Sequence, residues 1–263
     1  MIARITERWW EKTGAPTESP SPRQGRRAFT SIELLGLVGV VGAFAILFLP
    51  VVKRNRELSH RVQCRQNLRA LGVAAHLYAS QQGGRLFPHR RINGDWAGFN
   101  LPTRTFSQIT NLAGETAVDC PNLYPFTMPG QVYTPGTRAT ANEGAVLGYI
   151  YCGGIDETNM LRRYGWESPL TSSADPSWPL FVDLNASGWD QQFWAIAPHT
   201  ATGPRRLLGN TYLILQAHLK PIDLQAEGGN VGSLDGAVEW RAARRMKQDN
   251  WIYKYYFEAR GMW

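Results

Sequence analysis

The sequence predicts an α+β fold, in which a long N-terminal helix packs on a small antiparallel β-sheet with long loops. The segment Leu34–Val52 carries no charge, and apolar residues at helical spacing continue from it to Gly83-Gly84. Beyond residue 84, short alternating runs are separated by Gly and Pro, a pattern typical of strands and turns. One such pair flanks Asp235-Gly236, which indicates a β-hairpin.

Composition supports a folded domain rather than a disordered chain. Of 263 residues, 43% are hydrophobic, and Trp, Tyr and Phe each occur ten times. The net charge is +7, and the basic residues gather in Arg4–Arg27, Lys53–Arg69 and Arg241–Lys247. The first two groups flank the apolar segment, which favours contact with lipid headgroups over a face for nucleic acid. No recognition-helix signature or zinc-ligand spacing is present, so we expect no nucleic-acid partner.

The apolar segment predicts a membrane helix over residues 29–56. At 1.5 Å per residue, Leu34–Val52 spans about 28 Å, close to the hydrocarbon thickness of a bilayer. It runs directly into Lys53 without the small-residue motif that ends a secretory signal, so we expect it to stay with the protein. Pro50 removes one helix hydrogen bond and is expected to bend or locally melt the span.

Residues 1–28 read as a cytoplasmic leader peptide, polar and rich in Pro, that ends in Arg26-Arg27-Ala28. Glu33 is unusual because a carboxylate at the edge of an apolar span is costly unless it is paired or lies at the interface. One interpretation is that Glu33 marks the interface. The other is that cleavage before Phe29 creates an α-amino group that pairs with Glu33 of a neighbouring subunit.

The ten residues from Arg26 to Leu35, RRAFTSIELL, resemble the class III signal of type IV pilins and type II secretion pseudopilins. That signal consists of a basic leader, a small residue, Phe, three residues, Glu and an apolar helix. The resemblance implies cleavage between Ala28 and Phe29, N-methylation of Phe29, and assembly through Glu33. Ala28 stands where the family usually has Gly, and Pro50 matches a proline that pilin helices often carry.

Three further segments resemble a pseudopilin subgroup whose C-terminal domain has an H-x9-DG motif. Residues 62–72, VQCRQNLRALG, are similar to its helix, Cys120-Pro121 to its mid-domain loop, and residues 228–240, GGNVGSLDGAVEW, to its last motif. The family-motif residues are Gly229, Asn230, Asp235 and Gly236. The chain departs from the motif at Gln225, where the family has His, and at Ala237.

The resemblance implies a structural subunit of a type II secretion pseudopilus or type IV pilus-like fibre, and not an enzyme. Implied partners are a prepilin peptidase and N-methyltransferase, other copies and other pseudopilins, an inner-membrane secretion platform, and membrane lipid. The implied location is the bacterial inner membrane, single-pass, with the C-terminal domain periplasmic or extracellular. The alternative is a pilin-type membrane-anchored binding module for a glycan or other surface ligand. Five Trp residues could stack on sugars or pack in the core: Trp96, Trp166, Trp178, Trp189 and Trp194.

Residues 57–84 are expected to form an amphipathic spine helix, and 85–263 an extracytoplasmic β-rich domain. The apolar spine residues are Leu58, Val62, Leu68, Leu71, Ala75 and Tyr78. The expected strands are Val146–Cys152, Trp178–Leu184, Asn210–Gln216, Asn230–Leu234 and Ala237–Arg241. Residues 98–145 and 165–177 read as loops, and Arg244–Trp263 as a short aromatic helix.

Asp235-Gly236 is expected to form a type I′ turn, with a metal or polar site as the alternative role of Asp235. Cys120 and Cys152 either form a disulfide, closing about 33 residues, or are two buried free thiols. We expect no cofactor, except that hard oxygen ligands suit calcium. The calcium candidates are Asp175, Asp183 and Asp190, with Asn185 beside them.

Overall fold

The structure is a computed structural model that describes ten stretches of the chain. They are residues 30–89, 100–123, 127–128, 131–132, 145–156, 167–190, 192–209, 219–247, 250–254 and 258–263. The predicted α+β fold is confirmed: one long helix packs against small antiparallel sheets. By contacts the chain divides into two units, Met1–Ile46 and Leu47–Trp263, and the long helix belongs to both.

Helix α1 (Ser31–Gln81) begins with a capping box. The backbone amide and hydroxyl of Thr30 donate to Glu33 Oε2 at 2.8 and 2.9 Å, and the Glu33 amide donates to Thr30 Oγ1 at 3.3 Å. Such a reciprocal pair satisfies amides that the first turn leaves without helical partners. Glu33 therefore has a local role in starting α1.

The first part of α1 is long and apolar enough to cross a membrane, as predicted. Its most apolar 18-residue window has a mean hydropathy of 2.6, and no residue of that window is buried. The helix continues through Pro50, so the expected local melting is not seen. Gly83 and Gly84, with φ of +62° and +85°, end it as predicted, and the Gly84 amide donates to the Ala79 carbonyl at 2.8 Å.

The second part of α1 forms one wall of the core, but the predicted apolar face is only partly correct. Leu68, Leu71 and Ala75 are buried as expected. Leu58 and Val62 are 43% and 56% exposed. Polar residues take the corresponding buried positions nearer the apolar span: Glu57, Cys64 and Asn67. These polar positions face a cluster of polar residues from the domain, which explains why an apolar pattern missed them.

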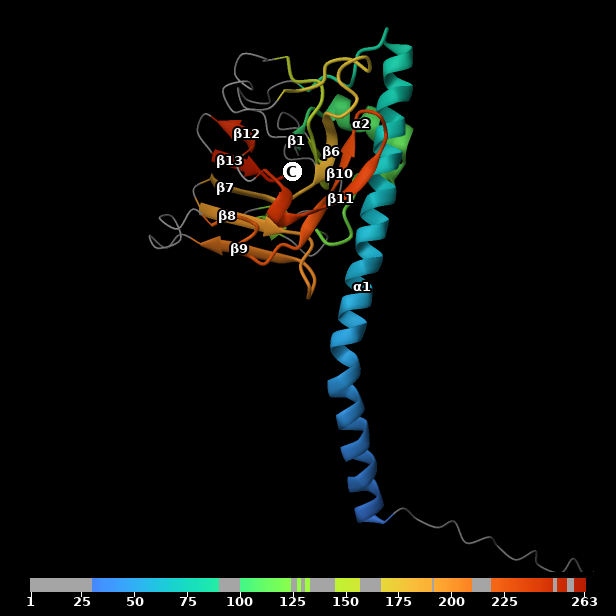
Figure 1. The fold of residues 1–263 in the computed structure, drawn as a ribbon, viewed down its shortest axis with the longest axis vertical. Coiled ribbons are helices and arrows are strands. Elements are labelled where there is room, and N and C mark those ends of the chain that lie inside the picture. The colour runs from blue at the N-terminus through green and yellow to red at the C-terminus, as the bar shows by residue number, and fades with distance from the viewer. Residues whose placement is uncertain are drawn as a thin grey trace, which may run out of the picture. The chain divides into compact units, whose positions relative to one another are not determined.

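The first main sheet has four antiparallel strands in the order β11-β10-β6-β5. Figure 1 labels three of them, β6, β10 and β11. The strands are β5 (Tyr149–Tyr151), β6 (Pro179–Asp183), β10 (Gly228–Ser233) and β11 (Val238–Ala242). They overlap four predicted strands. Helix α1 lies along the β10–β11 hairpin, where Arg65 Nε donates to the Val238 carbonyl at 3.1 Å and His76 Nε2 lies 2.6 Å from the Leu234 carbonyl.

The second main sheet has five antiparallel strands in the order β12-β13-β7-β8-β9. The strands are β7 (Ala186–Asp190), β8 (Gln192–Ala197), β9 (Arg205–Gly209), β12 (Asn250–Lys254) and β13 (Glu258–Gly261). The predicted helix over Arg244–Trp263 is therefore wrong, because β13 pairs with β7 and completes this sheet. The predicted strand Asn210–Gln216 lies outside the described residues.

The predicted loop 98–145 contains regular structure. Helix α2 (Thr103–Ala113) and the 3-10 helix η1 (Glu115–Val118) occupy its first half, and Ile109 is fully buried. Strand β1 (Asn100–Leu101) pairs with β4 (Ala145–Val146), and β2 (Thr127–Met128) pairs with β3 (Gln131–Val132). A further 3-10 helix, η2 (Ala243–Arg245), follows β11. Segment 167–177 is irregular, in agreement with the prediction.

The turn between β10 and β11 confirms the hairpin but corrects the turn type. Gly236 has φ +84°, whereas Asp235 does not have a positive φ, so a type I′ turn is excluded. The Gly236 amide donates to the Ser233 carbonyl at 3.0 Å, as in a type I turn followed by a left-handed glycine. Asp235 Oδ1 accepts from Ser233 Oγ at 2.6 Å and from the Ala237 amide at 2.9 Å, so its role is to hold the turn.

This turn should make stability depend on pH through Asp235. Hydrogen bonds from the Ser233 hydroxyl and the Ala237 amide hold the pKa of Asp235 below its usual value. A lowered folded-state pKa stabilises the fold above the unfolded pKa of about 3.9, and this stabilisation is lost as pH falls through the folded value. Asp235→Ala should lower the melting temperature at pH 7 but progressively less in acid, in thermal unfolding followed by circular dichroism. Asp235→Asn also lacks the titrating charge, so its deficit should shrink in acid by the same amount, but it should be smaller than that of Asp235→Ala at every pH because one acceptor remains.

Candidate functional site

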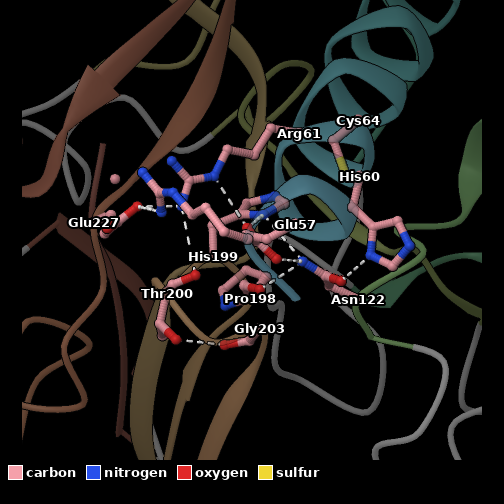
Figure 2. A network of polar contacts seen from close by, with 12 residues as sticks. Glu57, His60, Arg61, Cys64, Asn122, Pro198, His199, Thr200, Gly203 and Glu227 are labelled. Atoms are coloured by element: carbon pink, nitrogen blue, oxygen red, sulfur yellow. Dashed lines mark hydrogen bonds and ion pairs between the residues drawn. The ribbon is translucent and has the colours of Figure 1, made fainter. Parts of the chain in front are cut away.

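A buried cluster of polar side chains joins α1 to the loops and strands of the domain. Glu57, Arg61 and Cys64 project from one face of α1 because they follow at steps of four and three residues. Asn122 lies in the turn after η1, and His199 in the loop after β8. Figure 2 shows these side chains converging from α1 and the two loops. Glu57, Asn122 and His199 are each 2% exposed or less.

His199 is held between two carboxylates. Its Nδ1 lies 2.8 Å from Glu57 Oε1, and its Nε2 lies 3.3 Å from Asp183 Oδ2. Burial opposes protonation, but Asp183 and Glu57 outweigh it and raise the pKa of His199 well above its usual value. The distance to Asp183 is within ion-pair range, yet Nε2 makes no hydrogen bond among the described residues, so its N–H direction misses that oxygen.

Glu57 is the centre of this cluster. Its Oε1 accepts from Arg61 Nε at 3.0 Å, and its Oε2 accepts from Asn122 Nδ2 at 2.8 Å. Burial by itself raises the pKa of Glu57, but the bonds from His199, Arg61 and Asn122 lower it below the usual value. The same Asn122 amide donates to the Pro198 carbonyl at 2.8 Å, and Asn122 Oδ1 contacts His60 Nδ1. The carboxylate thus joins α1 to both loops.

The predicted motif residues Gly229 and Asn230 lie at this cluster. The Asn230 amide donates to Asp183 Oδ2 at 2.6 Å, and its side chain donates to the same oxygen at 3.0 Å and to the Arg61 carbonyl at 3.2 Å. A Cβ on Gly229 would lie 2.5 Å from Asn185 Nδ2 and 3.1 Å from Asp183 Cβ. Glycine therefore leaves room for these two side chains, and Asn230 connects the sheet to α1.

A partly exposed ion-pair network borders the cluster. Glu227 Oε2 accepts from Arg54 Nη1 at 2.6 Å and contacts Arg61 Nη2. The Arg61 guanidinium also stacks over the Trp240 ring, 4.3 Å from its centroid. These contacts fix the stretch of α1 that directly follows the apolar span to the residue before β10 and to strand β11.

The cysteines correct one sequence prediction. All three are buried free thiols, which was the alternative to a Cys120–Cys152 disulfide. Cys120 Sγ lies 3.3 Å from Cys64 Sγ, because the turn after η1 brings Cys120 over the buried face of α1. The sequence pattern does not predict this contact, because Cys64 lies in the predicted helix, 56 residues from Cys120.

Comparisons with protein-family models, with curated proteins and with solved structures found no match for the chain.

The calcium prediction is not supported by the arrangement of its candidates. Asp175 is exposed, and its Oδ1 accepts from the Ser177 amide and hydroxyl at 2.9 and 2.7 Å. Asp183 is buried among nitrogen donors, and the side chain of Asp190 lies outside the described residues. Among described residues, the group of His, Cys, Asp or Glu close enough to hold a metal is Cys64, Cys120 and His199. Its sulfur and imidazole donors are unlike the oxygen ligands of calcium.

The remaining predicted residues are placed as follows. Ala28 and Phe29 lie outside the described residues, whereas Glu33 and Pro50 lie in α1.

A hollow of about 680 Å³ opens between α1 and α2. Its lining residues are Arg56, His60, Gln63, Phe106, Thr110, Glu115, Thr116, Val118, Asp119 and Pro121, which include no Trp. Burial raises the pKa of Asp119, on the wall of this hollow, to about 6.

Proposed function

We propose that the chain is a prepilin-like structural subunit of a type II secretion pseudopilus or type IV pilus-like fibre. In this proposal it is processed before Phe29, held in the membrane by its apolar helix, and assembled through that helix. The observation that carries the proposal is the composition of α1. One continuous helix contains both an uncovered apolar span and the buried spine of a folded domain.

The attachment of α1 to the domain supports a structural role. The part of α1 that directly follows the apolar span binds the domain through polar side chains. These side chains are Arg54, Glu57 and Arg61. A fibre subunit extracted from the membrane by its helix must transmit that force to its domain. The buried bonds of Glu57, shielded from water, suit such a load better than exposed ion pairs do.

A second apolar face on α1 supports assembly between copies. Leu58, Val62, Val73 and Leu77 are between 43% and 60% exposed and lie within about 100° of one another around the helix. The buried face of the same helix stretch contacts the domain, so these four residues remain for a neighbour. In the proposed fibre, that neighbour is the helix of another copy.

Processing before Phe29 is the first test. We expect mass spectrometry of the membrane-extracted chain, co-expressed with a prepilin peptidase, to show N-methylated Phe29 as the first residue. Ala28→Gly should be cut at least as completely, because Gly is the residue the resembled family has there. Ala28→Glu should stay uncut, because a large charged side chain replaces a small one at the cut. An intact Met1 on the wild-type chain would refute the proposal.

Assembly through Glu33 is tested by separating its charge from its capping role. Glu33→Gln keeps the capping box with Thr30, since Gln is as suitable as Glu at that position. It removes the charge that would pair with the new α-amino group. We expect Glu33→Gln to reduce fibre formation, scored by electron microscopy of sheared material, at least as strongly as Glu33→Ala.

Thr30→Ala is the matched control, because it removes the cap but keeps the Glu33 carboxylate. It should assemble nearly as the wild type does. If Thr30→Ala fails while Glu33→Gln assembles, then capping and not charge pairing is the role of Glu33.

A membrane-anchored binding module is the second candidate function, favoured by the hollow beside α2. Its polar lining, with Arg56, Glu115 and Asp119, could take a hydroxylated ligand such as a sugar. Binding of the full chain, reconstituted in nanodiscs, to a glycan array would support this function. Loss of that binding in Phe106→Ala, with fibre formation unchanged, would assign the binding to the hollow.

A further inference from the structure

We propose that Cys64, Cys120 and His199 form a buried binding site for Zn²⁺, and that Asp183, which lies beside His199 but outside the group that these three form, completes it as the fourth ligand by a small movement. The two sulfurs and one His199 ring nitrogen all lie within 4.8 Å of one another, and all three residues are 0% exposed. Two thiolates, an imidazole and a carboxylate are the donor types that tetrahedral Zn²⁺ sites use.

The tautomer of His199 favours Nε2 as the metal ligand. Its Nδ1 is engaged by Glu57 Oε1 at 2.8 Å, which fixes the proton on that nitrogen. A zinc-bound histidine usually has its second nitrogen bonded to a carboxylate in this way. Nε2 is buried and makes no hydrogen bond among the described residues; a cation that binds there displaces the Nε2 proton and takes the lone pair of the neutral ring.

Asp183 has one buried oxygen to offer. Its Oδ2 accepts two hydrogen bonds from Asn230, but Oδ1 has no hydrogen-bond partner in the described part of the chain. A buried carboxylate oxygen without a partner is costly, and a cation would remove that cost. Asn122 and Arg61 bind Glu57 in turn, so the groups around the proposed ligands are held in place.

A disulfide between Cys64 and Cys120 is the competing explanation of the short contact. The sulfurs are 3.3 Å apart, which is longer than the S–S bond of about 2.05 Å and shorter than the roughly 3.8 Å between two thiolates on tetrahedral Zn²⁺. Either state requires a small movement. A disulfide would leave His199 Nε2 and Asp183 Oδ1 unsatisfied, whereas Zn²⁺ would bind both, so the unpaired atoms favour the metal.

The test is metal binding by the full chain in detergent, stripped with a chelator under reducing conditions and then given Zn²⁺. We expect about one Zn²⁺ per chain by elemental analysis after gel filtration. Cys64→Ala and Cys120→Ala should each weaken binding by at least about tenfold. Cys152→Ala is the matched control, since Cys152 is also a buried free thiol but lies outside the group, and it should bind as the wild type does.

Substitution of Co²⁺ for Zn²⁺ in the wild-type chain keeps the test decisive if a cysteine variant fails to fold. Thiolate ligands should give an intense near-ultraviolet charge-transfer band that Zn²⁺ abolishes by competition. Three results would overturn the proposal: no metal bound by the reduced wild type, a Co²⁺ spectrum without that band, or equal binding by folded Cys64→Ala. A Cys64–Cys120 disulfide that, once reduced, takes no metal would establish the competing explanation.

Discussion

Replacing Gly154 by alanine is expected to destabilise the domain by about 4 kcal/mol or more, enough to unfold many proteins. Gly154 has φ +73°, and a Cβ there would lie 1.9 Å from the Phe87 carbonyl oxygen. The backbone cannot move away easily, because the Gly154 amide donates to the Pro169 carbonyl and its carbonyl accepts from the His89 amide. Three chain segments meet at this glycine, so relief of the contact must break bonds between them.

Gly83→Ala is the matched control for the backbone strain alone. Its φ of +62° is similar, but among the described residues no atom lies within 4 Å of the place that a Cβ would take. It should cost about 1–2 kcal/mol, the ordinary penalty of a left-handed alanine. Urea unfolding of the full chain in detergent, followed by Trp fluorescence, measures both. Equal losses for the two variants would show that the contact with Phe87 relaxes freely.

The fold was predictable where local pattern and tertiary environment agree. The uncharged segment Leu34–Val52 predicts a long apolar helix, and Gly83-Gly84 ends that helix because left-handed backbone suits glycine. Strand β6 and the β10–β11 hairpin follow from apolar runs beside turn residues. These elements need no knowledge of distant parts of the chain.

The missed elements depend on pairing between distant segments. Strand β7 has the sequence ASGWD, which lacks the β-branched residues typical of strands, and it pairs with both β8 and β13. Helix α2 contains three Thr residues and follows Pro102, so its sequence predicts a loop. Burial of Phe106 and Ile109 against the core compensates for this weak helix propensity.

The buried polar cluster was only partly predictable. Asp183 was predicted as a calcium ligand, and Gly229 and Asn230 as motif residues, whereas Glu57 and His199 were not predicted at this site. Glu57 had one usable signal: it precedes Cys64 and Leu71 by whole heptads, so a carboxylate occupies the buried face of the helix. No local pattern can bring residues 57, 122, 183 and 199 together, because closure of the whole domain does so.

Removing the Glu57 carboxylate should have the second large effect. We expect Glu57→Ala to destabilise the chain by about 3–5 kcal/mol, the range for breaking a buried ion pair from one side. His199 would keep Asp183 as its carboxylate partner, and the Asn122 amide would lose one of its two oxygen acceptors, the other being the Pro198 carbonyl. Glu57→Gln should also be harmful, by about 1–3 kcal/mol, because a Gln amide turns one of the two acceptor oxygens into a donor facing other donors.

Glu239→Ala supplies the comparison on the surface of the same domain. Glu239 pairs with Arg241, but its side chain is 61% exposed, so its loss should cost less than about 1 kcal/mol. Unfolding by urea at neutral pH ranks the three variants. If Glu57→Ala behaved like Glu239→Ala, water would be reaching His199 and Asn122 once the carboxylate is gone. The cluster would then be a surface network, and α1 would depend on its apolar contacts alone for its attachment to the domain.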